Sequence, residues 1–261
     1  MRYEVHAGRV LTWSLEVHLV DHCNLRCAEC CTLSPGLPEA FVDPGALARD
    51  LERAATVLSP SLLKLTGGEP LLHPAFAECL RIAKESGVAK EVSVTTNGLL
   101  LRQAPEALWE LADRLTLSWY SSAPLPDRYL DWALERASRA GVAVNLKHVE
   151  AFQRMTPDRA VEDEAHARRV FDGCWMKHRC HLLRDGGFFR CTRPPHLEAR
   201  LWQLGIESAL SGLDGVALEG PGLLDRLVDY LDSEEPLTSC RSCLGNSGPF
   251  EPHRQLGTAP A

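Results

Sequence analysis

Five short runs rich in Val, Leu or Thr alternate with segments of helical periodicity, and this alternation limits the fold more than any other feature of the chain. Each run has the length of a strand, and parallel strands need a crossover, usually a helix, between them. The pattern therefore predicts an α/β fold with a mostly parallel sheet. We place the strands at residues 13–20, 62–66, 91–96, 115–120 and 142–149.

Helices are expected after each of the first four strands. Asp43 before Pro44 is typical of a helix start, and Pro60 is typical of a helix stop. The second helix carries an apolar stripe that includes Cys79, which we expect in the core, and it ends at Gly87. The expected helices cover about 44–59, 76–86, 105–112 and 130–137.

Within the strands one face is apolar and the other is polar, because successive side chains point to opposite faces. Parallel strands covered on both faces are usually apolar throughout. The polar face therefore predicts a lumen that holds water or a hydrophilic ligand, and the alternative is an open antiparallel sheet with one wet face. The polar residues are Glu16, His18, Lys64, Thr66, Ser93, Thr95, Asn97, Thr116, Ser118, Tyr120, Asn145 and Lys147.

Three cysteines follow the first strand with C-x3-C-x2-C spacing, namely Cys23, Cys27 and Cys30. Thiolates are the usual ligands of iron–sulfur clusters, and three of them leave one iron of a [4Fe–4S] cube open to another ligand. A closed zinc site and a disulfide framework are the alternatives. Cys31 is not expected to be a ligand, because adjacent thiolates point apart.

This loop resembles the signature of the radical S-adenosylmethionine (radical SAM) enzymes. The run Gly67-Gly68-Glu69-Pro70 after the second strand resembles the Gly-Gly-Glu-Pro motif of the same family. The resemblance implies a partial (β/α) radical SAM barrel of about five strands and four helices. It also implies that the open iron chelates S-adenosylmethionine (SAM) and that the Gly-Gly-Glu-Pro run contacts its methionyl amino group.

Polar groups at the ends of the third and fourth strands complete the expected cofactor site. Ligands of α/β folds collect at the carboxyl edge of the sheet, where Thr95 and Asn97 lie. By the resemblance, both face the ribose or methionyl part of SAM, with Ser118 as a further lumen residue, and turn formation is the alternative. One departure is Glu29, which occupies a position where the family usually has an aromatic residue against adenine.

Five further cysteines form a second group in the C-terminal part of the chain: Cys174, Cys180, Cys191, Cys240 and Cys243. An Asp-Gly-Gly run between Cys180 and Cys191 predicts a hairpin that sets these two residues opposite each other. The group resembles the Twitch domain, a shortened SPASM domain that holds an auxiliary [4Fe–4S] cluster. The resemblance favours Cys174, Cys191, Cys240 and Cys243 as ligands, with Cys180 as a competing ligand, and zinc is the alternative.

These signals divide the chain into three parts. Residues 1–155 are expected to form the barrel. Residues 156–244 are expected to form a small Twitch-like module of a hairpin and helices, which opens with a charged helix at 156–171 capped by Thr156. Residues 245–261 are rich in Gly and Pro and are expected to form a poorly ordered, flexible tail.

The resemblance implies an enzyme that cleaves SAM reductively to a 5′-deoxyadenosyl radical and removes hydrogen from a small polar metabolite such as a sugar, aminocyclitol or nucleoside. Chain size and cysteine spacing are most similar to members that oxidise a secondary alcohol and pass the electron to the auxiliary cluster. The implied cofactors are two [4Fe–4S] clusters and SAM, and the implied electron donor is a flavodoxin or ferredoxin. Lys147, Glu16 and His18 are candidate bases by position, and a structural salt bridge is the alternative for each.

Two other radical reactions stay open, a peptide maturase and a redox-neutral epimerase or dehydratase in which Cys180 donates hydrogen. Only twelve residues precede the first expected strand, which disfavours the maturase because no N-terminal peptide-recognition domain would fit there. The non-catalytic alternative is a binding module stabilised by a metal ion.

Charge and composition argue against several other classes. The formal net charge is −7 and the basic residues are dispersed among acidic ones, which disfavours nucleic-acid binding. No run approaches the roughly 18 to 20 apolar residues of a membrane span, and the N-terminus lacks the apolar core of a secretory signal. The ten cysteines are therefore expected in the reducing cytoplasm, where clusters and metals are more common than disulfides.

Overall fold

One mixed sheet organises the computed structural model, which describes residues 3–159, 161, 163–206 and 214–257. Its strands follow the order β10-β9-β8-β2-β3-β4-β5-β6, and β1 pairs with β2. The five expected strands are confirmed as β2 to β6, and these five are parallel to one another, which excludes the antiparallel alternative; only the short β1 pairs antiparallel with β2 in this part of the sheet. The five strands are β2 (Arg9–Val20), β3 (Leu58–Gly67), β4 (Glu91–Thr96), β5 (Arg114–Tyr120) and β6 (Ala143–Val149), and the additional strand β1 covers Val5–His6.

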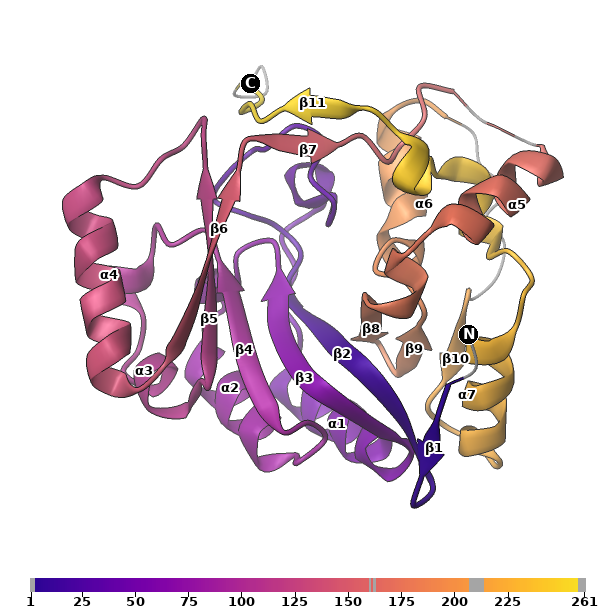
Figure 1. The fold of residues 1–261 in the computed structure, drawn as a ribbon, viewed down its shortest axis with the longest axis horizontal. Coiled ribbons are helices and arrows are strands. Elements are labelled where there is room, and N and C mark those ends of the chain that lie inside the picture. Colours follow the sequence, from indigo (N-terminus) through magenta and orange to yellow (C-terminus); the bar gives the residue numbers. More distant parts are fainter. Residues whose placement is uncertain (1–2, 160, 162, 207–213, 258–261) are drawn as a thin grey trace.

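The four expected barrel helices are also present, and they cover the apolar face of the sheet (Figure 1). Asp43 caps the first of them, since its Oδ2 accepts a hydrogen bond of 2.8 Å from the backbone N–H of Ala46. That helix ends at Val57 because Leu58 is already extended, so Pro60 lies inside β3 rather than at the helix stop. The helices are α1 (Pro44–Val57), α2 (Phe76–Glu85), α3 (Ala107–Leu111) and α4 (Asp127–Ala140).

The two faces of the sheet differ as the alternation predicts. Leu15, Leu63 and Leu65 are completely buried under the helices, and Leu63 lies beside both Leu15 and Val92 in the strand register. Burial of such side chains contributes roughly 1.5–3 kcal/mol each to folding. The polar residues face the opposite side, which is the concave side of the partial barrel. This arrangement confirms an α/β fold with the predicted parallel sheet.

The C-terminal part continues the barrel sheet instead of forming a separate sheet. Strand β8 lies parallel to β2, with Leu15 beside His181 and Val17 beside Leu183. A turn at Asp185 and Gly186, both with positive φ, joins β8 to β9 and confirms the hairpin. The elements of this part are α5 (Glu164–Gly173), β8 (His181–Arg184), β9 (Gly187–Phe189), α6 (Pro194–Gln203), β10 (Gly215–Ala217) and α7 (Leu223–Asp232).

Two expectations for the C-terminal part differ from the structure. Helix α5 begins only after Asp163, whose Oδ1 accepts a hydrogen bond from the backbone N–H of Ala165. Thr156 is therefore not its cap, and the Thr156 hydroxyl instead accepts a 2.7 Å hydrogen bond from Arg193. The expected flexible tail contains ordered structure: β11 (Phe250–Pro252) pairs antiparallel with β7 (Ala151–Gln153).

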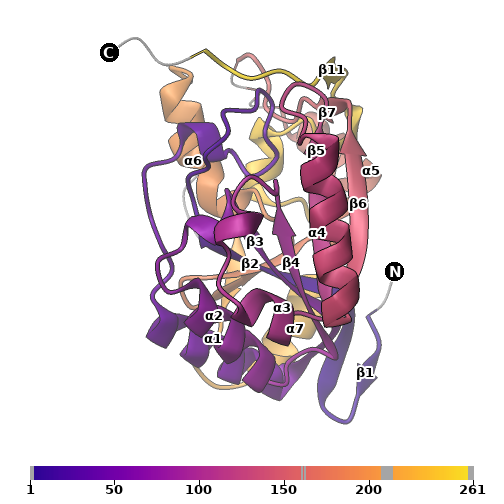
Figure 2. The same ribbon diagram turned by 90° about the vertical axis from the view of Figure 1, so that its left-hand side faces the viewer.

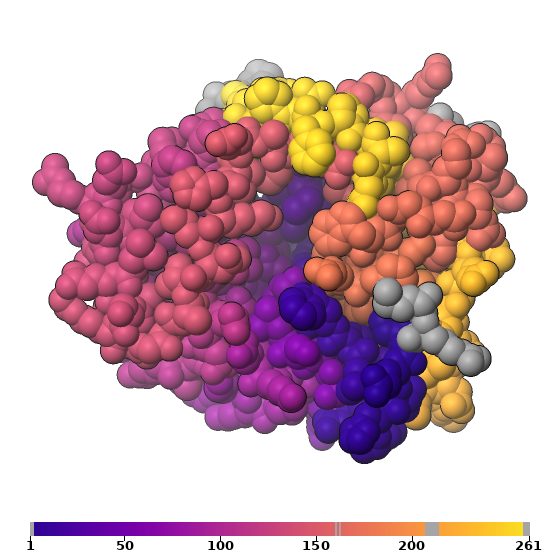
Figure 3. All heavy atoms as spheres, in the orientation of Figure 1, coloured from indigo at the N-terminus to yellow at the C-terminus, as the bar shows by residue number. Residues whose placement is uncertain are grey.

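The views from two sides place β7 and β11 over the end of the sheet where β2 to β6 finish (Figures 1 and 2). The space-filling view shows a hollow between the β6 side of the molecule, in magenta and pink, and the C-terminal part, in orange (Figure 3). The deep wall of this hollow is indigo and purple, the colours of the N-terminal strands. Among the described residues, no helix is long and apolar enough to cross a membrane.

Candidate active site

The three cysteines of the C-x3-C-x2-C loop line one cavity of about 120 Å³, and each sulfur meets a different polar partner. Cys23 Sγ accepts a 3.4 Å hydrogen bond from the backbone N–H of Leu25, and Asn97 Nδ2 lies 3.6 Å from the same sulfur. Cys27 Sγ accepts a 3.3 Å hydrogen bond from Gln255. Donors of this kind stabilise thiolate charge, which metal ligation requires. We call this space the cofactor cavity.

The Cys30 side of the loop is sharply turned. Cys30 Sγ lies 3.2 Å from the hydroxyl of Thr32, and Glu29 and Leu33 have φ values of 56° and 63°. Left-handed conformations cost roughly 1–2 kcal/mol for residues with a side chain, so the surrounding contacts have to hold the loop in this form. The Glu29 side chain lines a different cavity, so it contributes nothing to the cofactor cavity.

A C-terminal strap, residues 250–257, supplies some of that support. The backbone N–H of Ala28 donates to the carbonyl of Arg254 at 2.9 Å, and Leu256 donates in turn to the carbonyl of Arg26 at 2.6 Å. Gln255 also accepts a 2.8 Å hydrogen bond from the backbone N–H of Arg26. The strap therefore pairs with the loop on both sides of Cys27.

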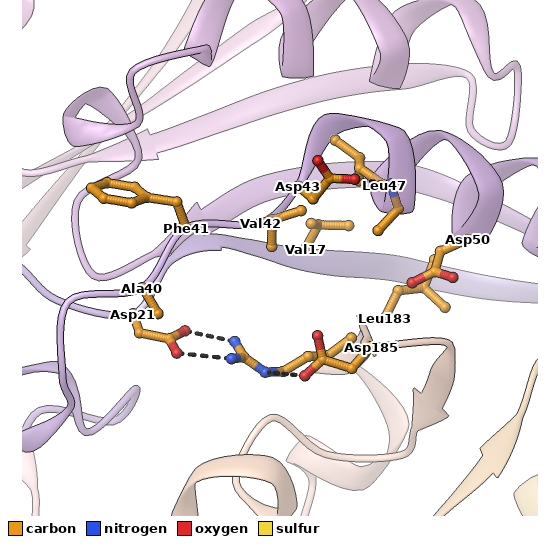
Figure 4. A pocket seen from close by; sticks show the side chains of 12 residues that line it. Val17, Asp21, Ala40, Phe41, Val42, Asp43, Leu47, Asp50, Leu183 and Asp185 are labelled. Atoms are coloured by element: carbon orange, nitrogen blue, oxygen red, sulfur yellow. Dashed lines mark hydrogen bonds and ion pairs between the residues drawn. The ribbon is translucent and has the colours of Figure 1, made fainter.

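An ion pair fixes the start of the same loop to the hairpin (Figure 4). Asp21, two residues before Cys23, accepts two hydrogen bonds of 2.6 and 2.8 Å from the guanidinium of Arg184 on β8. Both side chains are largely buried, with exposed fractions of 9% and 17%. Such two-point pairing fixes orientation as well as distance, so β8 positions the cysteine loop.

Gly67 and Gly68 let the end of β3 pass close under the loop. A Cβ atom on Gly68 would lie 1.8 Å from the backbone oxygen of His22, and Gly67 has a φ of 121°. The backbone N–H of Gly68 donates to the carbonyl of Val20 at 2.7 Å. Both glycines line the cofactor cavity, together with Thr95, Asn97, Ser118 and Lys147 of the predicted set.

The last two residues of the motif, Glu69 and Pro70, do not line the cofactor cavity. The Glu69 carboxylate is fully buried and accepts hydrogen bonds from the Thr96 hydroxyl at 2.7 Å, the Asn97 backbone N–H at 2.9 Å and the Leu71 backbone N–H at 3.1 Å. Burial raises its pKa to about 7, against the opposing effect of these hydrogen bonds. Its oxygens thus join the ends of β3 and β4, and its contact with SAM stays a prediction.

Aromatic side chains form the outer wall of the cofactor cavity. Tyr120, a residue of the predicted polar face, lines the cavity together with Phe152. The ring of His253 stacks on Tyr120 with 4.6 Å between centroids and lies 5.1 Å from Phe152. Sequence patterns missed Phe152, which lies on β7, and His253, which directly follows β11, because both strands are too brief to show a period.

A chain of charged and polar groups runs along the concave face beside the cavity. Lys64 Nζ lies 3.1 Å from Glu16, whose other oxygen lies 3.9 Å from Nε2 of His18. Although burial opposes it, the nearby His18 ring and the charge of Lys64 hold the pKa of Glu16 below its usual value. His18 Nδ1 lies 3.3 Å from Nε2 of His196 on α6, and burial lowers the pKa of His196 to about 3.

The three candidate bases are therefore placed differently. Lys147 lines the cofactor cavity, whereas Glu16 is engaged by Lys64 and His18 is packed against His196. His18 and His196 are both nearly inaccessible to solvent, at 2% and 3% exposure. His196 was not found from the sequence, because a single histidine in a helix carries no signal of which strand it will meet.

The C-terminal cysteines divide into a group of four and one outlier. Cys174, Cys191, Cys240 and Cys243 line one small cavity beside α5, which we call the four-cysteine cavity. Cys180 does not line it, and burial together with the nearby charge of Glu16 raises the pKa of its thiol to about 12. Within the described ranges, no three His, Cys, Asp or Glu side chains lie close enough together to bind a single metal ion.

Comparison with known proteins gives the class first. The family model of the radical SAM superfamily matches residues 17–155, and this chain belongs to that superfamily. Members of this family bind a [4Fe–4S] cluster and SAM, and the three loop cysteines with their donors offer a fitting ligand set.

Particular relatives match only a segment of the chain. GTP 3′,8-cyclase of Mycobacterium marinum is 39% identical over 117 residues, which is 42% of this chain and 32% of that protein. GTP 3′,8-cyclase of Aquifex aeolicus is 36% identical over 117 residues, or 42% of this chain and 36% of that protein. The matched segment thus spans about a third of the curated relatives.

Among solved structures, BtrN in complex with AdoMet and 2-DOIA superimposes with a TM-score of 0.54. The two chains are 15% identical, and the match covers 89% of this chain and 87% of BtrN. This likeness concerns the fold, and it extends through the C-terminal part as well as the barrel.

Proposed function

We propose that this protein is a radical SAM enzyme that oxidises a small polar metabolite, such as a sugar, aminocyclitol or nucleoside, and uses an auxiliary cluster as electron acceptor. The observation that carries the proposal is the presence of two separate cysteine-lined cavities, one with three cysteines and one with four. Three ligands leave an iron open for SAM, whereas four ligands complete a cluster suited to electron transfer. Architecture and cysteine spacing resemble those of 2-deoxy-scyllo-inosamine dehydrogenase.

In this proposal Cys23, Cys27 and Cys30 hold the first cluster, and the four-cysteine cavity holds the second. When bound, the first cluster supplies an electron that cleaves SAM and thereby starts hydrogen abstraction from the substrate. The chain contributes orientation: Asn97 and Gln255 donate toward two of the sulfurs, and Thr95 and Ser118 offer hydroxyl groups to the cofactor. Oxidation of an alcohol also releases a proton, and Lys147 is our first candidate to take it, because it lines the cavity.

Iron analysis tests the two-cluster assignment. For protein purified without oxygen, we expect about eight iron atoms per chain in the wild type and about four in the Cys23, Cys27, Cys30 triple Ala variant. Replacing Cys240 and Cys243 by Ala should also leave about four, while Cys79→Ala, which alters a buried core thiol, should retain about eight. Zinc in place of iron, or one cluster that survives the triple replacement, would contradict the assignment.

Substrate class is tested with labelled compounds. Incubation with SAM and reductant should transfer deuterium from the correct metabolite into 5′-deoxyadenosine. The panel should include sugars, aminocyclitols and nucleosides, and also GTP, because the curated relatives are named for a reaction of that nucleotide. A flavodoxin or ferredoxin is proposed as the physiological donor, and replacing chemical reductant with either protein should support the same transfer.

A redox-neutral epimerase or dehydratase is the second candidate, favoured by the position of Cys180 outside the four-cysteine cavity. Cys180 does not line the cofactor cavity either, and in this second proposal its thiol, which is not used as a cluster ligand, returns a hydrogen atom to the substrate radical. The Cys180→Ala variant separates the two functions. Lost product with unchanged iron content supports hydrogen donation, and unchanged product formation supports the dehydrogenase.

A further inference from the structure

We propose that a second cavity, lined by the arginines described next, binds the phosphate group of a small metabolite. This cavity has a volume of about 330 Å³ and shares Cys27 and Cys30 with the cofactor cavity, but none of the strand residues that line the latter. We call it the arginine pocket. Its four cationic residues come from the cysteine loop, from the start and the last turn of α6, and from the C-terminal strap: Arg26, Arg193, Arg200 and Arg254.

The charge of this pocket is opposite to that of the chain. The net charge of the whole sequence is −7, whereas the pocket holds four arginines and a single carboxylate, Glu29. Among the described residues, none of the four arginines forms an ion pair. Other arginines of the chain do, including Arg114 with Glu91 and Arg184 with Asp21. The pocket therefore has cationic groups available to an anion.

Arg193 gives the strongest indication of a ligand. Its side chain is only 2% exposed, and its one side-chain hydrogen bond within the described residues runs from Nη2 to the Thr156 hydroxyl. Its Nε is buried with no hydrogen-bond partner, and the same is true of Nε of Arg26. A buried guanidinium without a carboxylate is costly, so an anion that enters the pocket gains more there than at a solvated surface.

Arg193 also lines the four-cysteine cavity, where the charge of a cluster would partly balance it. A cluster in the four-cysteine cavity would not balance the charges of Arg26, Arg200 or Arg254, because none of the three lines that cavity. Arg26 lies in the loop of Cys27 and Cys30, where the proposed first cluster would bring negative charge, so the case for a separate anion rests on Arg200 and Arg254. A site for a separate anion accounts for all four residues.

Shape and chemistry favour a phosphate on a small molecule. Guanidinium groups bind phosphate through two parallel hydrogen bonds, and arginine is the usual residue for such recognition. Carboxylates on the surface of an acidic protein cannot reach Arg193, which is only 2% exposed, whereas a small ligand can. The inference goes beyond the proposed function and does not rest on it, because binding is measured without turnover.

Calorimetric titration of the intact, oxygen-protected protein tests the site, with inorganic pyrophosphate and ribose 5-phosphate as probes. We expect both to bind the wild type and to bind the Arg200→Gln, Arg254→Gln double variant at least about tenfold more weakly, since one lost charge-assisted hydrogen bond has that effect. The matched control, Arg128→Gln with Arg139→Gln on α4, has the same charge change and should bind both probes like the wild type. Affinity should also fall with added salt.

The outcomes separate the possible ligands. Binding of ribose 5-phosphate supports a phosphorylated metabolite, and binding of pyrophosphate without binding of ribose 5-phosphate overturns that assignment in favour of an inorganic anion. Absence of binding, or equal affinity in the double variant and the control, overturns the proposal. If the double variant instead slows reduction by a ferredoxin while pyrophosphate affinity is unchanged, the arginines form a protein docking surface and the proposal is also overturned.

Discussion

At the scale of the residue, Glu69 shows how a motif residue can serve the fold and the site together. Its carboxylate joins the end of β3 to the end of β4 through Thr96 and the backbone of Asn97. Asn97 in turn donates to Asn24 at 2.7 Å and lies beside Cys23. One buried carboxyl group therefore links the ends of two strands to the cysteine loop through Asn97.

The free energy of unfolding should depend on pH through the Glu69 carboxyl group. The folded-state pKa of about 7 lies above the usual value of 4.5, so the stabilisation from proton binding is complete below about pH 4.5 and is lost as pH rises through 7. Between pH 4.5 and 8 the wild type should lose about 3 kcal/mol of unfolding free energy through this group, and Glu69→Gln should not.

Urea unfolding at several pH values measures this difference, with Glu110→Gln at an exposed position of α3 as the control. The comparison concerns how the unfolding free energy changes with pH, because Gln lacks the second acceptor oxygen and therefore also shifts stability by an amount that does not depend on pH. Parallel curves for the wild type and Glu69→Gln would contradict the assigned role.

At the scale of the element, local sequence patterns predicted the strands and helices of the barrel. They did not predict the C-terminal strap that pairs with the cysteine loop. The alternation of Leu15, Val17 and Leu19 is a local period, so it reveals a strand without knowledge of any partner. The contact between Cys27 and Gln255 spans 228 residues and follows no period. Patterns of sequence therefore found the cysteines and glycines of the site, and they missed the strap.

The start of α5, the first helix of the C-terminal part, was also predicted wrongly from local sequence. Thr156 and Asp163 are both good capping residues, and the chain uses the one next to the continuous helical segment, while Arg193 on α6 occupies the hydroxyl of the other. A side-chain partner from a later element therefore holds the hydroxyl that the sequence prediction had assigned to the helix cap. The same limit applies to β8, whose parallel pairing with β2 depends on a docking that its own four residues do not specify.

Removal of the strap tests its role. A chain that ends at Pro249 lacks β11 and the four hydrogen bonds to the cysteine loop, which contribute about 1 kcal/mol each. We expect faster loss of iron to a chelator and faster tryptic cleavage at Arg26. A chain that ends at Gly257 keeps the strap and should behave like the full chain, and equal rates for both truncations would exclude a supporting role.

At the scale of the whole molecule, the continuous sheet joins the barrel and the C-terminal elements into a single structural unit. The pair of Asp21 and Arg184 joins the cysteine loop to the hairpin, and β8 extends the barrel at the β2 edge. The opposite edge, β6, has no further partner within the described region of the sheet, so the barrel stays open there. The hollow in Figure 3 lies along this open side.

Breaking the ion pair should therefore weaken the whole molecule. Arg184→Gln leaves the largely buried charge of Asp21 unpaired, which costs about 3 kcal/mol of unfolding free energy, whereas Asp21→Asn should cost less because Arg184 keeps its ion pair with Asp185. Arg139→Gln removes an exposed pair with Glu135 on α4 and should change stability by less than about 0.5 kcal/mol. Guanidinium unfolding measures both, and equal small effects would show that the hairpin does not support the loop.

The strap also sets an order of events during synthesis. Cys27 lies near the start of the chain, but its partner Gln255 emerges 228 residues later. At a ribosomal rate of roughly 5–20 residues per second, that interval is between about 10 and 45 s. During this time the nascent loop lacks its final contacts, so iron delivered to a half-made chain meets an unfinished ligand set. Metal loading is accordingly expected after translation of residue 257 rather than alongside it.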